Sequence, residues 1–227
     1  GPTMIRSAAK NFKDVGVVVD PADYETVIDD LKENDAVLSG ATKKELAYKA
    51  FRHTAKYDQL IQNYLSGQVA AEEELPEVML ERYDKKSDLR YGENPHQEAA
   101  FYQEPELNEP SITSAQQLHG KDLSFNNIND TDGALEVVKE FPDRPAAAVI
   151  KHANPCGMAV GDDLLTAYKQ AHAGDPLSAF GSIVALNRKV TAEVAHEIAD
   201  EDKFIEVVIA PEYEEEALEI LKARWDS

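Results

Sequence analysis

The second half of the chain alternates short apolar runs with helical patterns, and this alternation limits the folds open to it. The runs are rich in alanine and β-branched residues and lie at 146–150, 183–186 and 207–210. Helical spacing of apolar residues is expected at 130–140, 164–172, 191–198 and 214–221. Strands separated by helices indicate an α/β fold whose sheet has many parallel neighbours.

The first half predicts a smaller α/β unit that ends before an acidic connection. A helix is expected at 3–12, and the apolar run 15–19 is typical of a buried strand in a parallel sheet. A second helix is expected at 22–34. A long third helix should begin with Thr42 as its cap, because Glu45 follows three residues later, and should stop near Gly67. Residues 69–88 are acidic and charged and predict an inter-domain connection, with a short strand at 78–80 as an alternative.

Charge and composition exclude several classes of protein. The formal net charge is −20, from 43 acidic and 23 basic residues, and such a surface repels nucleic acid. Hydrophobic residues make up 43% of the chain, which argues against a disordered protein. The single cysteine, Cys156, rules out a disulfide within the chain and fits a cytoplasmic location. No apolar run approaches the roughly 20 residues that span a bilayer, so no membrane partner is expected.

The segment 151–157, which reads KHANPCG, is the sharpest candidate for chemistry. It follows the apolar run 146–150, and ligands gather beyond the carboxyl ends of strands in open α/β sheets. Pro155 and Gly157 predict a turn. A lysine beside a histidine disfavours the protonated imidazole, and a neutral imidazole can act as a general base. From these residues alone, an ordinary surface pair of Lys151 and His152 at a strand end remains the alternative.

Two other polar segments add candidate binding groups. Segment 89–97, LRYGENPHQ, supplies the Arg90 fork of donors, which suits phosphate, and the aromatic face of Tyr91. An ordinary loop with a salt-bridged arginine is the alternative there. Segment 120–132 holds more short polar side chains than helix capping alone explains. These are Asn126, Asn127, Asn129, Asp130 and Asp132.

Taken together, these segments resemble the start of the transformylase domain in the AICAR transformylase/IMP cyclohydrolase family. The matching stretches are 89–97, 118–127 (LHGKDLSFNN) and 151–157, in the same order and spacing, and 175–181 (DPLSAFG) and 206–211 (EVVIAP) extend the match. Residues 1–11 resemble the late part of the cyclohydrolase domain. The resemblance implies three parts: 1–68, the C-terminal part of the cyclohydrolase domain; 69–88, a linker; and 89–227, the N-terminal part of the transformylase domain.

The resemblance also implies a fold and an activity. The fold would be a partial methylglyoxal-synthase-like domain followed by a cytidine-deaminase-like α/β subdomain. The family transfers a formyl group from 10-formyltetrahydrofolate, a cosubstrate, to AICAR, which gives FAICAR, and then closes FAICAR to IMP. His152 would be the transformylase base, Lys151 its electrostatic partner, and Lys10 the lysine that assists ring closure. The implied substrate-binding residues are Arg90, Tyr91, Asn127, Gly181 and Glu206.

Departures from the family pattern leave two alternatives open. The N-terminal phosphate-binding segment and the folate-binding, dimer-completing half of the transformylase domain are missing, so we expect this chain alone to be inactive. It could then be a nucleotide-binding fragment, with a homodimer expected of the full-length protein. A zinc nucleobase deaminase is the other enzyme class considered. It is disfavoured, and no metal site is expected, because the His-x-Glu group and the second cysteine after Cys156 are lacking.

Overall fold

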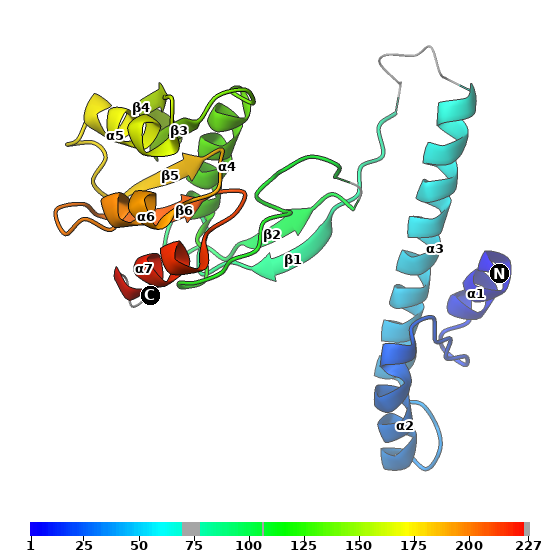
Figure 1. Cartoon of the computed structure of the whole chain (residues 1–227). Helices are drawn as coiled ribbons and strands as arrows, with labels where there is room; N and C mark the ends of the chain where they lie inside the picture. The colour runs from blue at the N-terminus through cyan, green and yellow to red at the C-terminus, as the bar shows by residue number, and fades with distance from the viewer. Residues whose placement is uncertain (70–77, 106, 225–227) are drawn as a thin grey trace. The chain divides into compact units, whose positions relative to one another are not determined.

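The structure is a computed structural model that describes residues 1–69, 78–105 and 107–224. The chain forms two compact units, Gly1–Glu81 and Arg82–Ser227, and each is described by itself (Figure 1). Mixed α/β structure, as the sequence predicts, is found in the second unit.

In its described part, the first unit consists of helices around a small core. The helices are α1 (Pro2–Lys10), the 3-10 helix η1 (Pro21–Asp23), α2 (Tyr24–Glu33) and the long α3 (Gly40–Val69). Ala9 of α1 is fully buried against Ala47 and Ala50 of α3. Small residues at this contact allow the two helices to approach closely.

Two expectations for this unit are wrong. The run 15–19 has no strand assignment; Val17 and Val19 instead pack on the small helical core. No other strand is found among residues 1–69 and 78–81 to pair with it, and an apolar run without a partner forms no ladder. The cap of α3 is Ser39 rather than Thr42, because the Ser39 hydroxyl accepts a hydrogen bond from the Thr42 amide at 3.1 Å. The helix also continues two residues past Gly67, to Val69.

The second unit contains two sheets. Strands β1 (Asp84–Asp88) and β2 (Ala100–Gln103) form an antiparallel pair. The main sheet has the order β4-β3-β5-β6, built from β3 (Ala146–Lys151), β4 (Asn154–Val160), β5 (Ser182–Leu186) and β6 (Ile205–Ile209). The helices are α4 (Phe125–Lys139), α5 (Leu164–Gly174), α6 (Ala192–Ile198) and α7 (Glu215–Arg224).

The main sheet is covered on both faces, which makes three layers. Alternate residues of β3 face opposite sides: Val149 belongs to the core shared with α5, α6 and α7, whereas Ile150 packs with α4. Both side chains are at most 1% exposed. Strands buried on both faces read as continuous apolar runs, which is why 146–150 and 183–186 were recognisable in the sequence.

The topology differs from the expected parallel sheet. β3 is antiparallel to both neighbours, and only β5 and β6 run parallel. The predicted turn at Pro155 and Gly157 is not found, because both residues lie within β4. Residues 84–88, assigned there to the connection, form β1, while 78–80 have no strand assignment and 70–77 lie outside the described residues.

Helix α4 begins five residues earlier than expected, at Phe125, because Ser124 caps it. The Ser124 hydroxyl accepts from the Asn127 amide at 3.3 Å, and the Asn127 side chain accepts from the Ser124 amide at 3.1 Å. This reciprocal capping box satisfies two backbone donors. Part of the polar cluster at 120–132 is therefore explained by capping.

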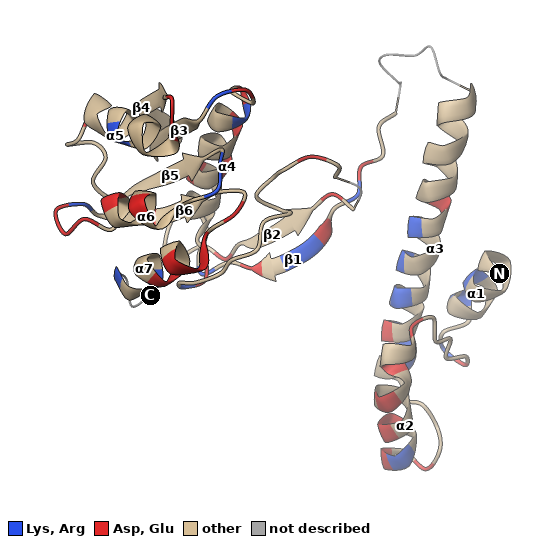
Figure 2. Cartoon of the chain, in the orientation of Figure 1, with Lys and Arg blue, Asp and Glu red and all other residues tan. Residues whose placement is uncertain are grey.

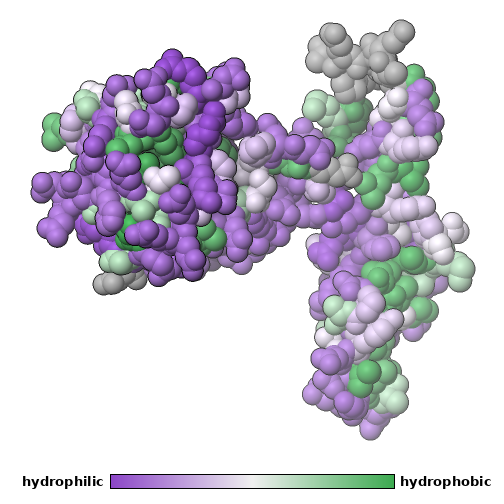
Figure 3. Space-filling model, in the orientation of Figure 1, coloured by the Kyte–Doolittle hydropathy of each residue, from purple (hydrophilic) through white to green (hydrophobic). Residues whose placement is uncertain are grey.

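The surface is strongly acidic in some places and apolar in others. Acidic positions are visible on α2, α6 and α7 (Figure 2). Hydrophobic surface follows α3 (Figure 3), where Leu60, Ile61 and Leu65 are between 39% and 48% exposed. Within the described residues, no helix combines the length and apolar character needed to cross a bilayer.

Candidate functional site

The connection between β3 and β4 is a two-residue turn formed by His152 and Ala153. Lys151 pairs with Asn154 across it, and the φ angles of His152 and Ala153 are +54° and +60°. Positive φ at both central residues is the signature of a type I′ hairpin turn, which favours sequences such as Asn-Gly. A left-handed backbone costs an ordinary residue roughly 1–2 kcal/mol. Strain of this kind is concentrated at functional sites.

Two hydrogen bonds hold this strained turn. The Ala153 amide donates to Asp130 Oδ1, on α4, at 2.8 Å. The Asn154 side chain donates from Nδ2 to the His152 carbonyl oxygen at 2.9 Å. Both partners fix the backbone, and the His152 imidazole itself is exposed.

Lys151 is fixed at the other side of the turn. Its ammonium donates to the carbonyl oxygen of Gly181 at 2.6 Å, and the side chain is half-buried. Gly181 has a φ of +69°, and a Cβ there would come within 2.9 Å of Lys151 Nζ. The Gly181 amide in turn donates to the Phe204 carbonyl at 2.7 Å. Glycine is therefore favoured at 181, because its positive φ strains other residues and a Cβ would displace the Lys151 ammonium from its present position.

Asn127 and Glu206 meet, although 79 positions separate them. Asn127 Nδ2 donates to Glu206 Oε2 at 3.0 Å. Asn127 lies in the first turn of α4, and Glu206 lies in β6 and is exposed. The Asn127 side chain thus has two roles, because its oxygen also caps α4.

The backbone of Arg90 and Tyr91 runs beside the start of α4. The Arg90 amide donates to the Leu123 carbonyl and the Phe125 amide donates to the Tyr91 carbonyl, both at 3.2 Å. The Arg90 guanidinium carbon lies 4.9 Å from the centroid of the Tyr91 ring, in a cation–π contact. Arg90 is exposed, so its donors remain accessible to an anion.

All the predicted site residues except Lys10 therefore gather where α4 begins. The end of β3 lies there beside the starts of β5 and β6, since Ile150 pairs with Ile183 and Ser182 with Ile205. Of these three strands, only β3 has its carboxyl end at the candidate site. Asp130 had been noted in the sequence only as one polar residue among several. The need for a partner at the Ala153 amide follows only from the positive φ angles of His152 and Ala153, which the sequence does not show.

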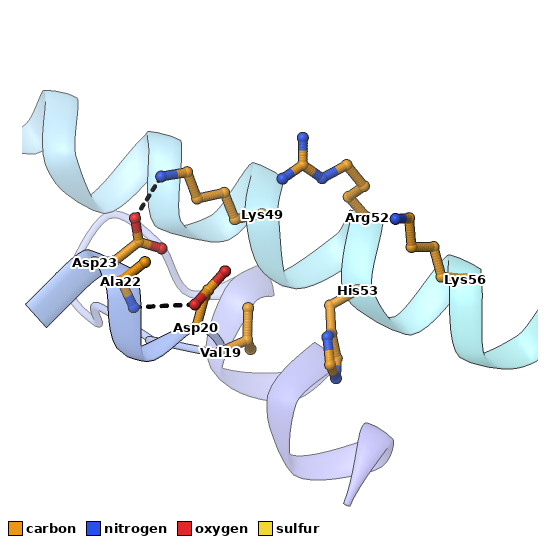
Figure 4. A pocket seen from close by; sticks show the side chains of 8 residues that line it. All are labelled: Val19, Asp20, Ala22, Asp23, Lys49, Arg52, His53 and Lys56. Carbon is orange, nitrogen blue, oxygen red and sulfur yellow. Dashed lines mark hydrogen bonds and ion pairs between the residues drawn. The ribbon is translucent and has the colours of Figure 1, made fainter. Parts of the chain in front are cut away.

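Lys10 is exposed at the end of α1, in the other unit. A cavity of about 310 Å³ in that unit does not include it (Figure 4). Basic side chains of α3 line this cavity together with Asp23, whose carboxylate pairs with Lys49. None of the predicted site residues lines it.

Metal-binding groups are sparse. Among residues 1–69, 78–105 and 107–224, no three His, Cys, Asp or Glu side chains lie close enough to hold a metal ion. The Cys156 thiol, half-buried in β4, donates to the Val149 carbonyl at 3.4 Å. Burial is the main cause that raises the pKa of this thiol.

We expect Cys156 to react slowly in the folded chain. A raised pKa lowers the fraction of thiolate, which is the reactive form, and partial burial restricts access to it. Iodoacetamide at pH 7.5 should label Cys156 much more slowly in buffer than in concentrated urea, as followed by mass spectrometry. Equal rates in the two conditions would show that the thiol is not protected.

Asn127 offers a test of the capping box. Replacement by alanine should lower the free energy of unfolding by about 1 kcal/mol, because one cap is lost. Asn127→Gln should cost less, since its side-chain oxygen can still accept from the Ser124 amide, as a glutamine does at this position of a capping box, and its amide can still donate to Glu206. Urea unfolding of the two variants measures the difference, and equal losses would contradict a role in capping.

The chain is similar in sequence to known proteins. The family model described as "AICARFT/IMPCHase bienzyme" matches residues 8–227. The chain belongs to the AICARFT/IMPCHase bienzyme family. Three relatives called "Bifunctional purine biosynthesis protein PurH", from Bacillus cereus, Bacillus mycoides and Bacillus anthracis, are each 55% identical over 227 residues. Each match covers 99% of this chain and 43% of the relative. The chain thus spans less than half the length of these relatives in the family.

Proposed function

We propose that the full-length protein containing this chain makes IMP in two steps of purine synthesis, as a transferase and a hydrolase. The first step transfers a formyl group from 10-formyltetrahydrofolate to the 5-amino group of AICAR, and the second closes FAICAR to IMP. The observation that carries the proposal is the gathering of His152, Lys151, Asn127 and Glu206 where β3 ends and β5 and β6 begin, beside the Arg90 segment. Family membership over residues 8–227 supports it.

The arrangement supports separate roles for His152 and Lys151 in formyl transfer. The AICAR amine is conjugated with an electron-poor ring and is a weak nucleophile. His152 would accept its proton as nitrogen attacks the formyl carbon. The Lys151 ammonium would stabilise charge that develops on the formyl oxygen. The bond from the formyl carbon to the folate nitrogen then breaks, and that nitrogen takes up the proton that His152 had accepted.

The remaining residues would bind the nucleotide. Arg90 provides donors suited to the phosphate, and Tyr91 an aromatic face beside it. The Glu206 carboxylate would accept hydrogen bonds from the amine or the carboxamide, with Asn127 holding it in place. Lys10, in the first unit, would serve ring closure.

The finer assignments belong to the same proposal. Residues 1–68 would be the end of a methylglyoxal-synthase-like cyclohydrolase domain, 69–88 a linker, and 89–227 the start of a cytidine-deaminase-like transformylase domain. The full-length protein would act as a cytoplasmic homodimer that binds AICAR, FAICAR, IMP and folate. The 227-residue chain would not turn over by itself.

Two assays test this proposal. The full-length protein should convert AICAR and 10-formyltetrahydrofolate to IMP, whereas the 227-residue chain should show no turnover in either step. AICAR added to this chain should raise its thermal midpoint if the nucleotide half-site is formed without the rest. Substantial formyl transfer by the isolated chain would refute the expected inactivity, and no transfer by the full-length protein would refute the function.

A zinc deaminase would be recognised by a different result. Elemental analysis after dialysis would find about one zinc per chain, and AICAR or a nucleobase would lose ammonia without folate. We expect neither result, because Cys156 is the only cysteine of the sequence.

A further inference from the structure

The geometry points to Asp130 as the positioning residue for His152, acting through the backbone of Ala153. This inference rests on the function proposed above and adds a residue to the same site. Asp130 Oδ1 accepts from the Ala153 amide at 2.8 Å, across 23 positions of sequence. No contact with the His152 side chain is involved; the bond acts on the residue that follows it.

The turn needs an external brace because its own residues disfavour it. His152 and Ala153 both have positive φ, and alanine has no local side-chain hydrogen bond that would stabilise a left-handed backbone. The direction of the imidazole depends on this backbone, since the Cα of His152 lies in the turn. A change in φ at Ala153 would therefore alter the backbone of the turn at His152. The imidazole would then point away from the amine of bound AICAR.

α4 makes Asp130 a rigid anchor. Ser124 caps the helix six residues before Asp130, and the neighbouring Thr131 is buried, with its hydroxyl donating to the Asn127 carbonyl. The helix packs on β3 and β5 through Ala134 and Val138. Asp130 thus links the turn that contains His152 to α4, the helix that carries Asn127. This link keeps His152 at a fixed position relative to Asn127.

Four variants of the full-length protein test the role. Asp130→Ala should lower kcat for formyl transfer by about 10–10²-fold, with little change in the KM for AICAR, because displacement of a catalytic group acts on the chemical step. Asp130→Asn should stay near the wild-type rate, since its amide oxygen can still accept from Ala153. The double variant Asp130→Ala with Ala153→Gly should recover most of the loss, because glycine adopts positive φ without a brace. Glu136→Ala, on the same helix and exposed, is the matched control and should behave as wild type.

The outcomes separate this inference from the proposed function. Wild-type kcat in Asp130→Ala, or no recovery in the double variant, would overturn the positioning role. A rate for Asp130→Asn as low as that of Asp130→Ala would also overturn it and assign the effect to charge. Failure of the unmodified full-length protein to transfer formyl would instead refute the function. The brace can then still be tested in the 227-residue chain: exchange of the Ala153 amide with deuterium should be faster in Asp130→Ala than in wild type, and equal rates would refute the brace.

Discussion

Replacing His152 by asparagine in the full-length protein should lower the rate of formyl transfer by about 10²–10⁴-fold, the usual contribution of a general base. Asparagine is the better choice of replacement, because it tolerates the left-handed backbone that the structure has at His152. The turn should then keep its shape while the proton acceptor is lost. Initial rates with AICAR and 10-formyltetrahydrofolate measure the effect.

Two controls make this result specific. Ring closure, started from FAICAR, should continue at the wild-type rate, because Lys10 and the first unit are unchanged. His196→Asn removes another exposed imidazole, on α6, and should leave both steps unaffected. His152→Ala should lose at least as much transfer activity as His152→Asn. If transfer survives in both variants, His152 is not the base.

Sequence patterns located the buried elements of the second unit well. The runs 146–150 and 183–186 lie between two layers of helices, so nearly every residue must be apolar, and such runs stand out. The direction of the strands was not visible in the same way. An apolar run reads alike in parallel and antiparallel sheets, and the turn that makes β3 and β4 antiparallel consists of His152 and Ala153, which carry no ordinary turn signal.

The candidate site was recognised by resemblance rather than by physics alone. Asn127 and Glu206 are 79 positions apart, and nothing in spacing or composition predicts that they meet. Gly181 is different: its positive φ and its contact with Lys151 are physical reasons for glycine that can be stated only once the backbone is known. The run 15–19 was predicted as a strand and has no strand assignment. An apolar run predicts a strand only where a neighbouring strand can pair with it.

Gly157→Ala should destabilise the second unit by about 3 kcal/mol or more, at the upper end of the cost of overpacking. A Cβ at Gly157 would lie 1.8 Å from the carbonyl oxygen of Ala171 and 2.8 Å from its carbonyl carbon. Both atoms belong to the backbone of α5, so no side chain can move aside. The opposing Gly174 would bring a Cβ to 3.3 Å from Gly157 Cα, so small residues on both elements permit this close packing.

The measurement is urea unfolding of the 227-residue chain, followed by labelling of Cys156, which lies beside Gly157 in β4. Gly133→Ala is the matched control: its Cβ would meet only the Ala153 carbonyl oxygen, at 3.9 Å. In the interior of α4, that change should stabilise the unit by about 0.5–1 kcal/mol. Equal midpoints for the two variants would mean that β4 and α5 do not pack as described. Gly157 would then be explained by the turn that the sequence predicts, and not by the close approach of α5 to β4.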